Sequence, residues 1–320
     1  DYPCPDAREL VSELGMQYRS ACVLTESLRI QLAAGKRPAE LDLGRWETLR
    51  VPLTDLLESR RRYLGQMDLN VASPLVWKFY ADTLHMLAGY GASIVRLDAF
   101  AYAHKAVGER NFLNEPGTWS LLARLQTIAD ADGVTLLPEI HASYGEKVYE
   151  KLAAKGYAVY DFFLPGLMID ALERGSADTL AAWAQEILDK HILTVNMLGC
   201  HDGIPMLDLK GLLPEERIQN LIDLIVTRGG MVKNLHGQKN VYYQVNATYY
   251  SALGESDAKL LLARAIQLFM PGKPQVWYLD LFAGKNDCEA VARAGEGGHK
   301  EINRTNLTKV QIAEALEKPV

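Results

Sequence analysis

Three short blocks of this sequence each carry an apolar run that ends in a carboxylate. The blocks are VRLDAF (95–100), LLPEIH (136–141) and GCHDGI (199–204), and their carboxylates belong to Asp98, Glu139 and Asp202. An apolar run of this length predicts a buried strand, and an unpaired buried charge is costly, so we expect each carboxylate at an exposed strand terminus. Three such ends separated by helical segments predict one face of an α/β barrel, where barrel enzymes hold their chemistry.

Two basic residues stand beside these carboxylates. Arg96 precedes Asp98 by two positions on the same strand, so both side chains point to the same face, and the arginine lowers the pKa of the carboxyl. His201 directly precedes Asp202. Converging carboxylates beside an arginine and a histidine indicate glycosidic-bond chemistry, and the apolar strand before Glu139 predicts a raised pKa for a general acid. A structural ion pair or a buried, satisfied glutamate is the alternative.

The chain from residue 73 onward alternates strand and helix. Helices begin at Ser73-Pro74 and near residues 117, 146, 176, 214 and 256, and the first of them has Leu75, Phe79 and Leu84 on its apolar face. The predicted strands are 92–98, 134–140, 158–165, 192–202 and 273–280. This alternation predicts parallel βαβ units, and a closed barrel of this kind needs eight strands, of which five are recognisable. Residues 7–35 are helical by composition, and residues 49–63 are helical or irregular.

The composition excludes several classes of protein. Of the 320 residues, 48% are hydrophobic and 23% charged, which is typical of a globular protein, and the net charge of −6 argues against a nucleic-acid partner. No apolar stretch approaches the ~18–20 residues that span a bilayer, so no membrane partner is expected. The four cysteines show no paired spacing, which favours a reducing cytoplasm. Because no metal-ligand or nucleotide-binding spacing is present, we expect neither a metal nor a cofactor.

The blocks and their flanking segments resemble the α-amylase superfamily, glycoside hydrolase family 13, in its sucrose-phosphorylase-like branch. This resemblance covers residues 64–320, whereas residues 1–63 form an unassigned, mostly helical segment. It implies a (β/α)8 TIM barrel of which this chain holds the last five strands, and an incomplete barrel if residues 1–63 do not supply the rest. The segments that carry it, besides the three blocks, are RLDAFAYAHK (96–105), YQVNATYYSALG (243–254), PGKPQVWYLDLFAGKND (271–287) and EINRTN (301–306).

The resemblance also implies roles for individual residues. Asp98 would be the nucleophile, Glu139 the general acid/base, and Asp202 the carboxylate that stabilises the transition state. Some residues of the substrate site could equally be core aromatics or solvated surface charges. The substrate-binding residues so implied are Arg96, Tyr102, His201, His236, Tyr243, Gln244 and Arg304.

The function so implied is that of a retaining α-glucosyl phosphorylase, which would act on sucrose or a related α-glucoside and use inorganic phosphate. The acceptor stays open among fructose, fructose 6-phosphate, glycerol, glycerate and water. Two alternatives remain: an α-glucosidase or transglucosidase of the same superfamily, and a catalytically weak or silent barrel fragment. An open sheet edge would favour a homo-oligomer.

Overall fold

The computed structural model describes residues 2–60, 68–106, 108–234, 242–295 and 297–317. The chain forms two compact units, Asp1–Leu69 and Asn70–Val320, each with a hydrophobic core of its own. The predicted boundary between residues 63 and 64 lies outside the described residues. None of the described helices is long and apolar enough to cross a membrane.

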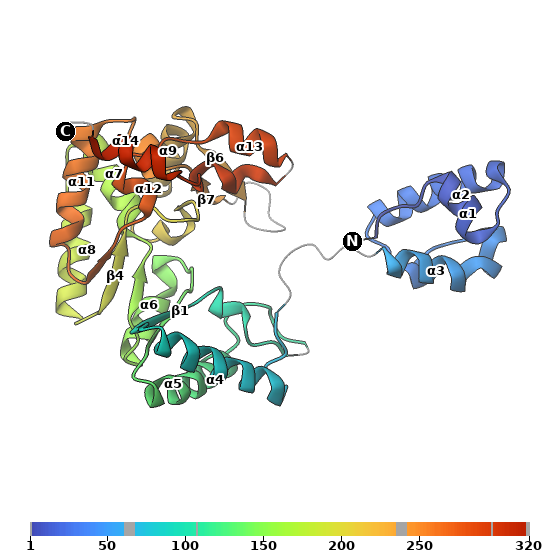
Figure 1. The fold of residues 1–320 in the computed structure, drawn as a ribbon, viewed down its shortest axis with the longest axis horizontal. Coiled ribbons are helices and arrows are strands. Elements are labelled where there is room, and N and C mark those ends of the chain that lie inside the picture. Colours follow the sequence, from blue (N-terminus) through green and yellow to red (C-terminus); the bar gives the residue numbers. More distant parts are fainter. Residues whose placement is uncertain (1, 61–67, 107, 235–241, 296, 318–320) are drawn as a thin grey trace. The chain divides into compact units, whose positions relative to one another are not determined.

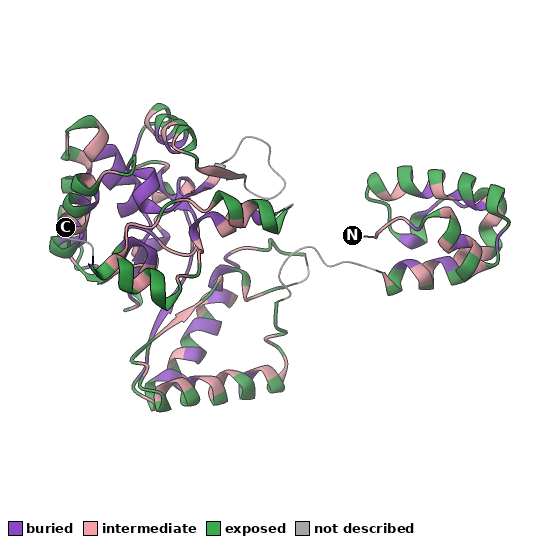
Figure 2. Cartoon of the chain, turned by 45° about the horizontal axis from the view of Figure 1, so that its top comes forward, coloured by how far each residue is buried: buried purple, intermediate pink, exposed green. Residues whose placement is uncertain are grey.

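The first unit is a small helical bundle. It holds α1 (Ala7–Leu14), α2 (Tyr18–Ala33) and α3 (Arg50–Ser59), with 3₁₀ turns at Pro38–Glu40 and Gly44–Leu49. Asp6 and Glu9 form a capping box at the start of α1, and Gly15 ends that helix at a φ of 65°, so the predicted helical stretch 7–35 is two helices. Buried leucines from all three helices form its core (Figure 2).

Five parallel strands organise the second unit, and they match the five predicted positions with shorter bounds. They are β1 (Ile94–Leu97), β2 (Thr135–Pro138), β3 (Val159–Asp161), β4 (Thr194–Met197) and β8 (Lys273–Gln275). β1 pairs with β2, and β4 lies between β3 and β8 (Figure 1). Leu137, Tyr160, Val195 and Met197 pack together on one side of these strands, which joins β2, β3 and β4 around a common apolar cluster.

Helices connect these strands and cover their other side. The predicted helix starts near residues 73, 117, 146, 176, 214 and 256 are confirmed to within two residues, whereas α7 was not predicted. Ser256 caps its helix by accepting a hydrogen bond from the backbone N–H of Lys259. The helices are α4 (Pro74–Gly89), α5 (Gly117–Ala131), α6 (Val148–Ala154), α7 (Leu164–Arg174), α8 (Asp178–Asp189), α9 (Glu215–Thr227), α10 (Tyr249–Ala252), α11 (Asp257–Phe269), α12 (Tyr278–Leu281), α13 (Cys288–Ala294) and α14 (Lys309–Glu317).

A second, antiparallel sheet follows β4. Its strands are β5 (Ile204–Pro205), β6 (Met231–Asn234) and β7 (Tyr242–Asn246), with β7 in the middle. Gly203 leads into it, and a Cβ there would lie 2.8 Å from the carbonyl oxygen of Val245, so only glycine allows this close approach. This small sheet brings β7 next to the loop that carries Asp202.

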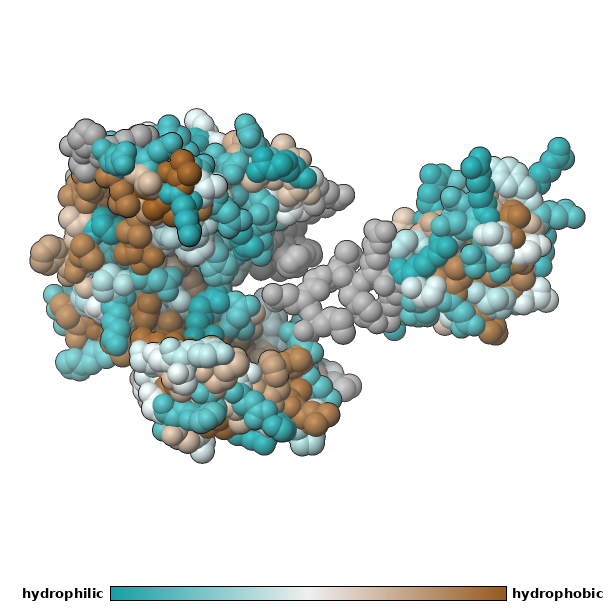
Figure 3. Space-filling model, viewed as in Figure 1, coloured by the Kyte–Doolittle hydropathy of each residue, from teal (hydrophilic) through white to brown (hydrophobic). Residues whose placement is uncertain are grey.

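Within the described ranges, β1 pairs with no strand on the side away from β2, and β8 with none on the side away from β4. The predicted apolar face of α4 is wrong in part: Trp77 and Leu84 are buried, but Leu75 is 77% exposed and Phe79 is also exposed. Leu261 and Phe269 of α11 are exposed as well, and Figure 3 shows brown surface on the side of the unit where α8 and α11 lie. Both flanks of the five-stranded array therefore carry uncovered apolar side chains.

Candidate active site

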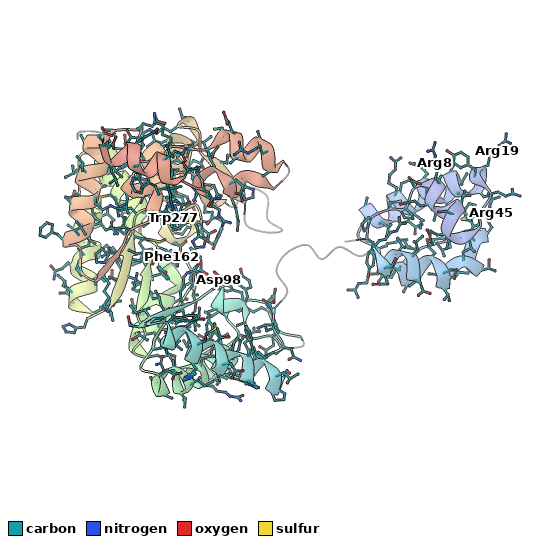
Figure 4. The ribbon with its side chains drawn as sticks, in the orientation of Figure 1. Arg8, Arg19, Arg45, Asp98, Phe162 and Trp277 are labelled. Atoms are coloured by element: carbon teal, nitrogen blue, oxygen red, sulfur yellow. The ribbon has the colours of Figure 1, made fainter. Side chains whose placement is uncertain are left out.

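The carboxyl ends of the five parallel strands meet at one pocket of about 290 Å³. Asp98 follows β1, Glu139 follows β2, Phe162 follows β3, and the loop with Asp202 follows β4. Figure 4 shows Asp98, Phe162 and Trp277 in the same region of the second unit. The pocket is lined by Arg96, Glu139, His141, Tyr160, Phe162, Met197, Cys200, His201, Asp202, Gly203, Pro205 and Gln275.

Arg96 joins the first two carboxylates. One of its Nη atoms lies 2.6 Å from Asp98 Oδ1 and the other lies 2.8 Å from Glu139 Oε1. Both carboxylates therefore contact the same guanidinium, each through a different Nη atom. Asp98 is 59% exposed, whereas Glu139 is buried, so one carboxylate is open to solvent and the other is desolvated.

Three donors surround the Glu139 carboxylate. Besides Arg96, the backbone N–H of Ala99 donates to Oε2 at 2.7 Å, and His141 Nε2 lies 3.5 Å from Oε1. Burial alone raises the pKa of Glu139, but His141, Ala99 and Arg96 together lower it to about 2. The predicted raised pKa is therefore wrong for this arrangement, because the apolar strand ends beside three donors, two of which, Arg96 and the Ala99 N–H, come from β1 and the residues that follow it.

His141 and Asp208 are two members of the site to which the sequence patterns assigned no role. His141 stands two residues after Glu139. The same two-residue spacing that placed Arg96 beside Asp98 could therefore have predicted His141 beside Glu139. Its ring stacks on Phe162 with centroids 3.8 Å apart, and its Nδ1 lies 3.3 Å from both carboxylate oxygens of Asp208. Asp208 lies in the 3₁₀ turn Leu207–Leu209 after the second sheet begins, and no local pattern links it to this pocket.

The segment 300–304 contacts the loop that carries Asp202. Arg304 Nη2 lies 3.3 Å from Asp202 Oδ1, and its Nε donates to the His201 carbonyl at 2.7 Å. The Asn303 amide donates to the carbonyl oxygens of Cys200 and Asp202, each at 2.8 Å. Lys300 Nζ lies 3.7 Å from Asp202 Oδ1. Asp202 therefore faces two cations from one short segment, besides His201 Nε2 at 3.5 Å.

Of the four remaining predicted substrate residues, Tyr243 and Gln244 lie close to the site or are buried, Tyr102 is partly exposed, and His236 is not among the described residues. The Tyr243 ring meets the His141 ring edge-to-face at 5.2 Å, and burial raises the pKa of Tyr243, with Asp208, Glu139 and Asp202 adding to the effect. Gln244 is 1% exposed, and its amide atoms have no hydrogen-bond partner among the residues described. Tyr102 is partly exposed and packs against Phe112, with ring centroids 5.1 Å apart. His236 lies outside the described residues.

This arrangement suits chemistry at a sugar carbon. It provides an exposed carboxylate, a buried carboxylate beside it, and a third carboxylate held by cations, which are the parts that a glycosidic site needs. The residues described contain no group of three or more histidine, cysteine, aspartate or glutamate side chains that could hold a metal ion.

Comparison with known proteins gives a consistent result. A sucrose 6(F)-phosphate phosphorylase of Ilumatobacter coccineus is 59% identical over 275 residues, which are 83% of this chain and 53% of that protein. A sucrose phosphorylase of Streptococcus mutans is 39% identical over 259 residues, 80% of this chain and 52% of the relative. A glucosylglycerol phosphorylase of Marinobacter adhaerens is 35% identical over 263 residues, 80% of this chain and 53% of the relative. No family model matches the chain.

Among solved structures, the sucrose 6F-phosphate phosphorylase from Thermoanaerobacter thermosaccharolyticum aligns with a TM-score of 0.74 and 37% identity. The alignment covers 80% of this chain and 52% of that one. The chain thus spans about half the length of the curated relatives it matches, and the α/β arrangement of its second unit is that of the aligned enzyme.

Proposed function

Since four fifths of this chain resembles the sucrose-phosphorylase-like branch of the α-amylase superfamily, we propose that residues 64–320 carry the catalytic carboxylates of a retaining α-glucosyl phosphorylase. The single observation that carries this proposal is the pairing of Asp98 and Glu139 on one guanidinium at the ends of neighbouring parallel strands. A retaining pair needs its carboxyl groups about 5–5.5 Å apart, and contact with one guanidinium supports the proposal because it keeps both carboxylates close together.

In the proposed reaction, Asp98 attacks the anomeric carbon of the glucosyl unit and forms a covalent β-glucosyl ester. Glu139 gives its proton to the leaving oxygen in the same step. Phosphate then gives a proton to Glu139 and attacks the same carbon from the side the leaving group vacated, the Asp98 ester bond breaks, and α-glucose 1-phosphate is released. Glu139 must be protonated for the first step, so we infer that the bound sugar weakens at least one of the three donor contacts that hold this carboxylate ionised.

We assign the other residues by their position around these two. Asp202, held by Arg304, would accept hydrogen bonds from sugar hydroxyls and stabilise positive charge at the anomeric carbon, with His201 beside it. Gln244 and Tyr243 would meet the acceptor, because the Gln244 amide is buried with unused hydrogen-bonding capacity. Tyr102 and His236 complete the acceptor side in this proposal.

The substrate is proposed as sucrose or a related α-glucoside. The relatives are named for sucrose, sucrose 6(F)-phosphate, glucosylglycerol and glucosylglycerate, which supports fructose, its 6-phosphate, glycerol or glycerate as the acceptor. Product analysis decides between this proposal and a hydrolase or transglucosidase. The protein is incubated with each glucoside, with and without excess phosphate, and we expect glucose 1-phosphate as the main product. Free glucose as the main product in excess phosphate would move the protein to the hydrolases.

A second candidate, a weak or silent barrel fragment, rests on the unpaired strand edges among the described residues: β1 and β8 each have an open side, and β2 does not pair with β3. Five strands do not close an eight-stranded barrel, and open edges with exposed apolar flanks favour association. We therefore propose that the chain alone is incomplete, turns over slowly and associates. Light scattering should show a dimer or larger species. A monomer with ordinary phosphorylase turnover would contradict the incomplete barrel.

A further inference from the structure

Asp208 is a buried carboxylate that none of the proposed catalytic steps uses. It is 1% exposed and lies in the turn Leu207–Leu209, which is anchored where the backbone N–H of Met206 donates to the carbonyl of Tyr243. A carboxylate this deep is strongly unfavourable unless a cation or hydrogen-bond donor faces it. Both of its oxygens lie 3.3 Å from His141 Nδ1, so the imidazole is the group that satisfies it.

The His141 ring has little freedom to turn. Phe162 stacks on one face of the ring at 3.8 Å with an interplanar angle of 23°, and Tyr243 meets it at 71°. With Nδ1 directed to Asp208, Nε2 is directed to Glu139 Oε1 at 3.5 Å. His141 thus contacts the buried Asp208 through one ring nitrogen and the buried carboxylate of the proposed site, Glu139, through the other.

We propose that Asp208 is a positioning residue: by accepting the Nδ1 proton of His141, it orients the ring and holds it as an imidazolium whose Nε2–H supports the Glu139 carboxylate. Two carboxylates flank one imidazole, and that arrangement favours the doubly protonated ring. The catalytic consequence rests on the proposed function, but the charge state of His141 does not.

The other groups around His141 bear on this charge. Arg96 contacts the same Glu139 oxygen, Oε1, as His141 does, so its charge opposes a cation at His141, and His201 lines the same pocket. Asp202 is a further acidic group there, while Tyr243 is neutral at ordinary pH because burial raises its pKa. Burial by itself lowers the pKa of His141, yet Asp208 and Glu139 raise it to about 9.

Nuclear magnetic resonance on the full chain tests this directly, with the histidine rings labelled with ¹⁵N and ¹³C. The signal of His141 is identified by its loss in His141→Gln. We expect both ring nitrogens to be protonated at pH 7, with an apparent pKa above about 8 against the usual 6.5. A neutral His141 in the wild-type protein at pH 7 would overturn the proposal, and this result needs no variant of Asp208 to fold.

Asp208→Asn keeps the shape of the side chain and removes its charge. We expect the apparent pKa of His141 to fall by at least about one unit. The matched control is Asp170→Asn, which removes another buried carboxylate that is paired with Arg217 and does not line the pocket, and which should leave His141 unchanged. An equal pKa in Asp208→Asn and wild type would also overturn the proposal.

If the chain turns over sugar, the pH profile adds a kinetic readout. Loss of the imidazolium should raise the pKa of Glu139, which must be protonated to act as the acid, so the alkaline limb of kcat/KM should move to higher pH in Asp208→Asn but not in Asp170→Asn. A chain that shows no phosphorolysis but keeps the expected His141 titration would contradict the proposed function and leave the role of Asp208 intact.

Discussion

Replacement of Arg96 by methionine tests the centre of the site without requiring any turnover. The side chain keeps much of its length and loses its charge, so Glu139 stays buried but loses the guanidinium at 2.8 Å. Asp98 loses its partner as well, but it is more than half exposed and can return to water. We expect Arg96→Met to lower the free energy of unfolding of the second unit.

The size of this loss follows from the burial of each partner. Leaving a buried charge without its partner costs about 3–5 kcal/mol, and an exposed ion pair is worth about 0–1 kcal/mol. Glu139 keeps the donors of Ala99 and His141, so the loss of free energy due to Glu139 should lie at the lower end of the range of about 3–5 kcal/mol. We therefore expect about 3 kcal/mol in total at pH 7.

The stability difference between Arg96→Met and wild type should depend on pH. Because the folded pKa of Glu139 is about 2, below its ordinary 4.5, its stabilising contribution is present above pH 4.5 and is lost as the pH falls through 2. Without Arg96 the folded pKa rises, and a protonated Glu139 at low pH no longer needs the arginine. The difference between variant and wild type should be larger at pH 7 than at pH 4.

The assay is urea unfolding followed by tryptophan fluorescence. Four of the five tryptophans lie in the second unit and one, Trp46, lies in the first, so the two transitions are fitted separately. Arg293→Met is the matched control. Arg293 is exposed and forms a weak ion pair with Glu289, with the charged atoms 3.7 Å apart, so its loss should cost under about 0.5 kcal/mol. Arg96→Lys should recover part of the stability. A loss in Arg96→Met no larger than in the control, or one that is equal at both pH values, would refute the reasoning.

Three further predictions concern single carboxylates. Asp98→Asn should reduce turnover by several orders of magnitude. Its free energy of unfolding should stay within about 0.5 kcal/mol of wild type, because the residue is exposed. A variant that keeps more than a tenth of the activity would exclude Asp98 as the nucleophile. Glu139→Gln should slow poor leaving groups but largely spare glucosyl fluoride, which needs no proton, and equal losses on both substrates would indicate a structural role. Burial raises the pKa of Asp161 from 3.8 to about 6 despite hydrogen bonds from Trp183, Leu164 and Phe163, so its charge opposes folding as the pH rises through 6. Asp161→Asn should gain about 2 kcal/mol relative to wild type between pH 4 and pH 7 in urea titrations, and a constant difference over that range would contradict this assignment.

The sequence by itself determined the five parallel strands and the three carboxylates at their ends. Strand cores such as VTLLP are apolar runs bounded by polar residues, and this local signal matches the tertiary structure best in β2, β3 and β4, which are almost entirely buried. Helix starts at residues 74 and 257 were also local, since proline suits the first helical turn at Pro74 and the Ser256 side chain caps within one turn. The pairing of Arg96 with Asp98 followed from the period of two along a strand.

The tertiary structure alone decided how these groups act on one another. Asp208 reaches His141 across 67 positions of sequence, and Arg304 reaches Asp202 across 102, through loops that no periodic pattern predicts. Donors that surround Glu139 in space, namely His141, the Ala99 N–H and Arg96, outweighed its burial and reversed the expected shift in its pKa. Exposure of Leu75 and Phe79 on α4 was likewise beyond the sequence, because an apolar face is buried only where another element packs against it.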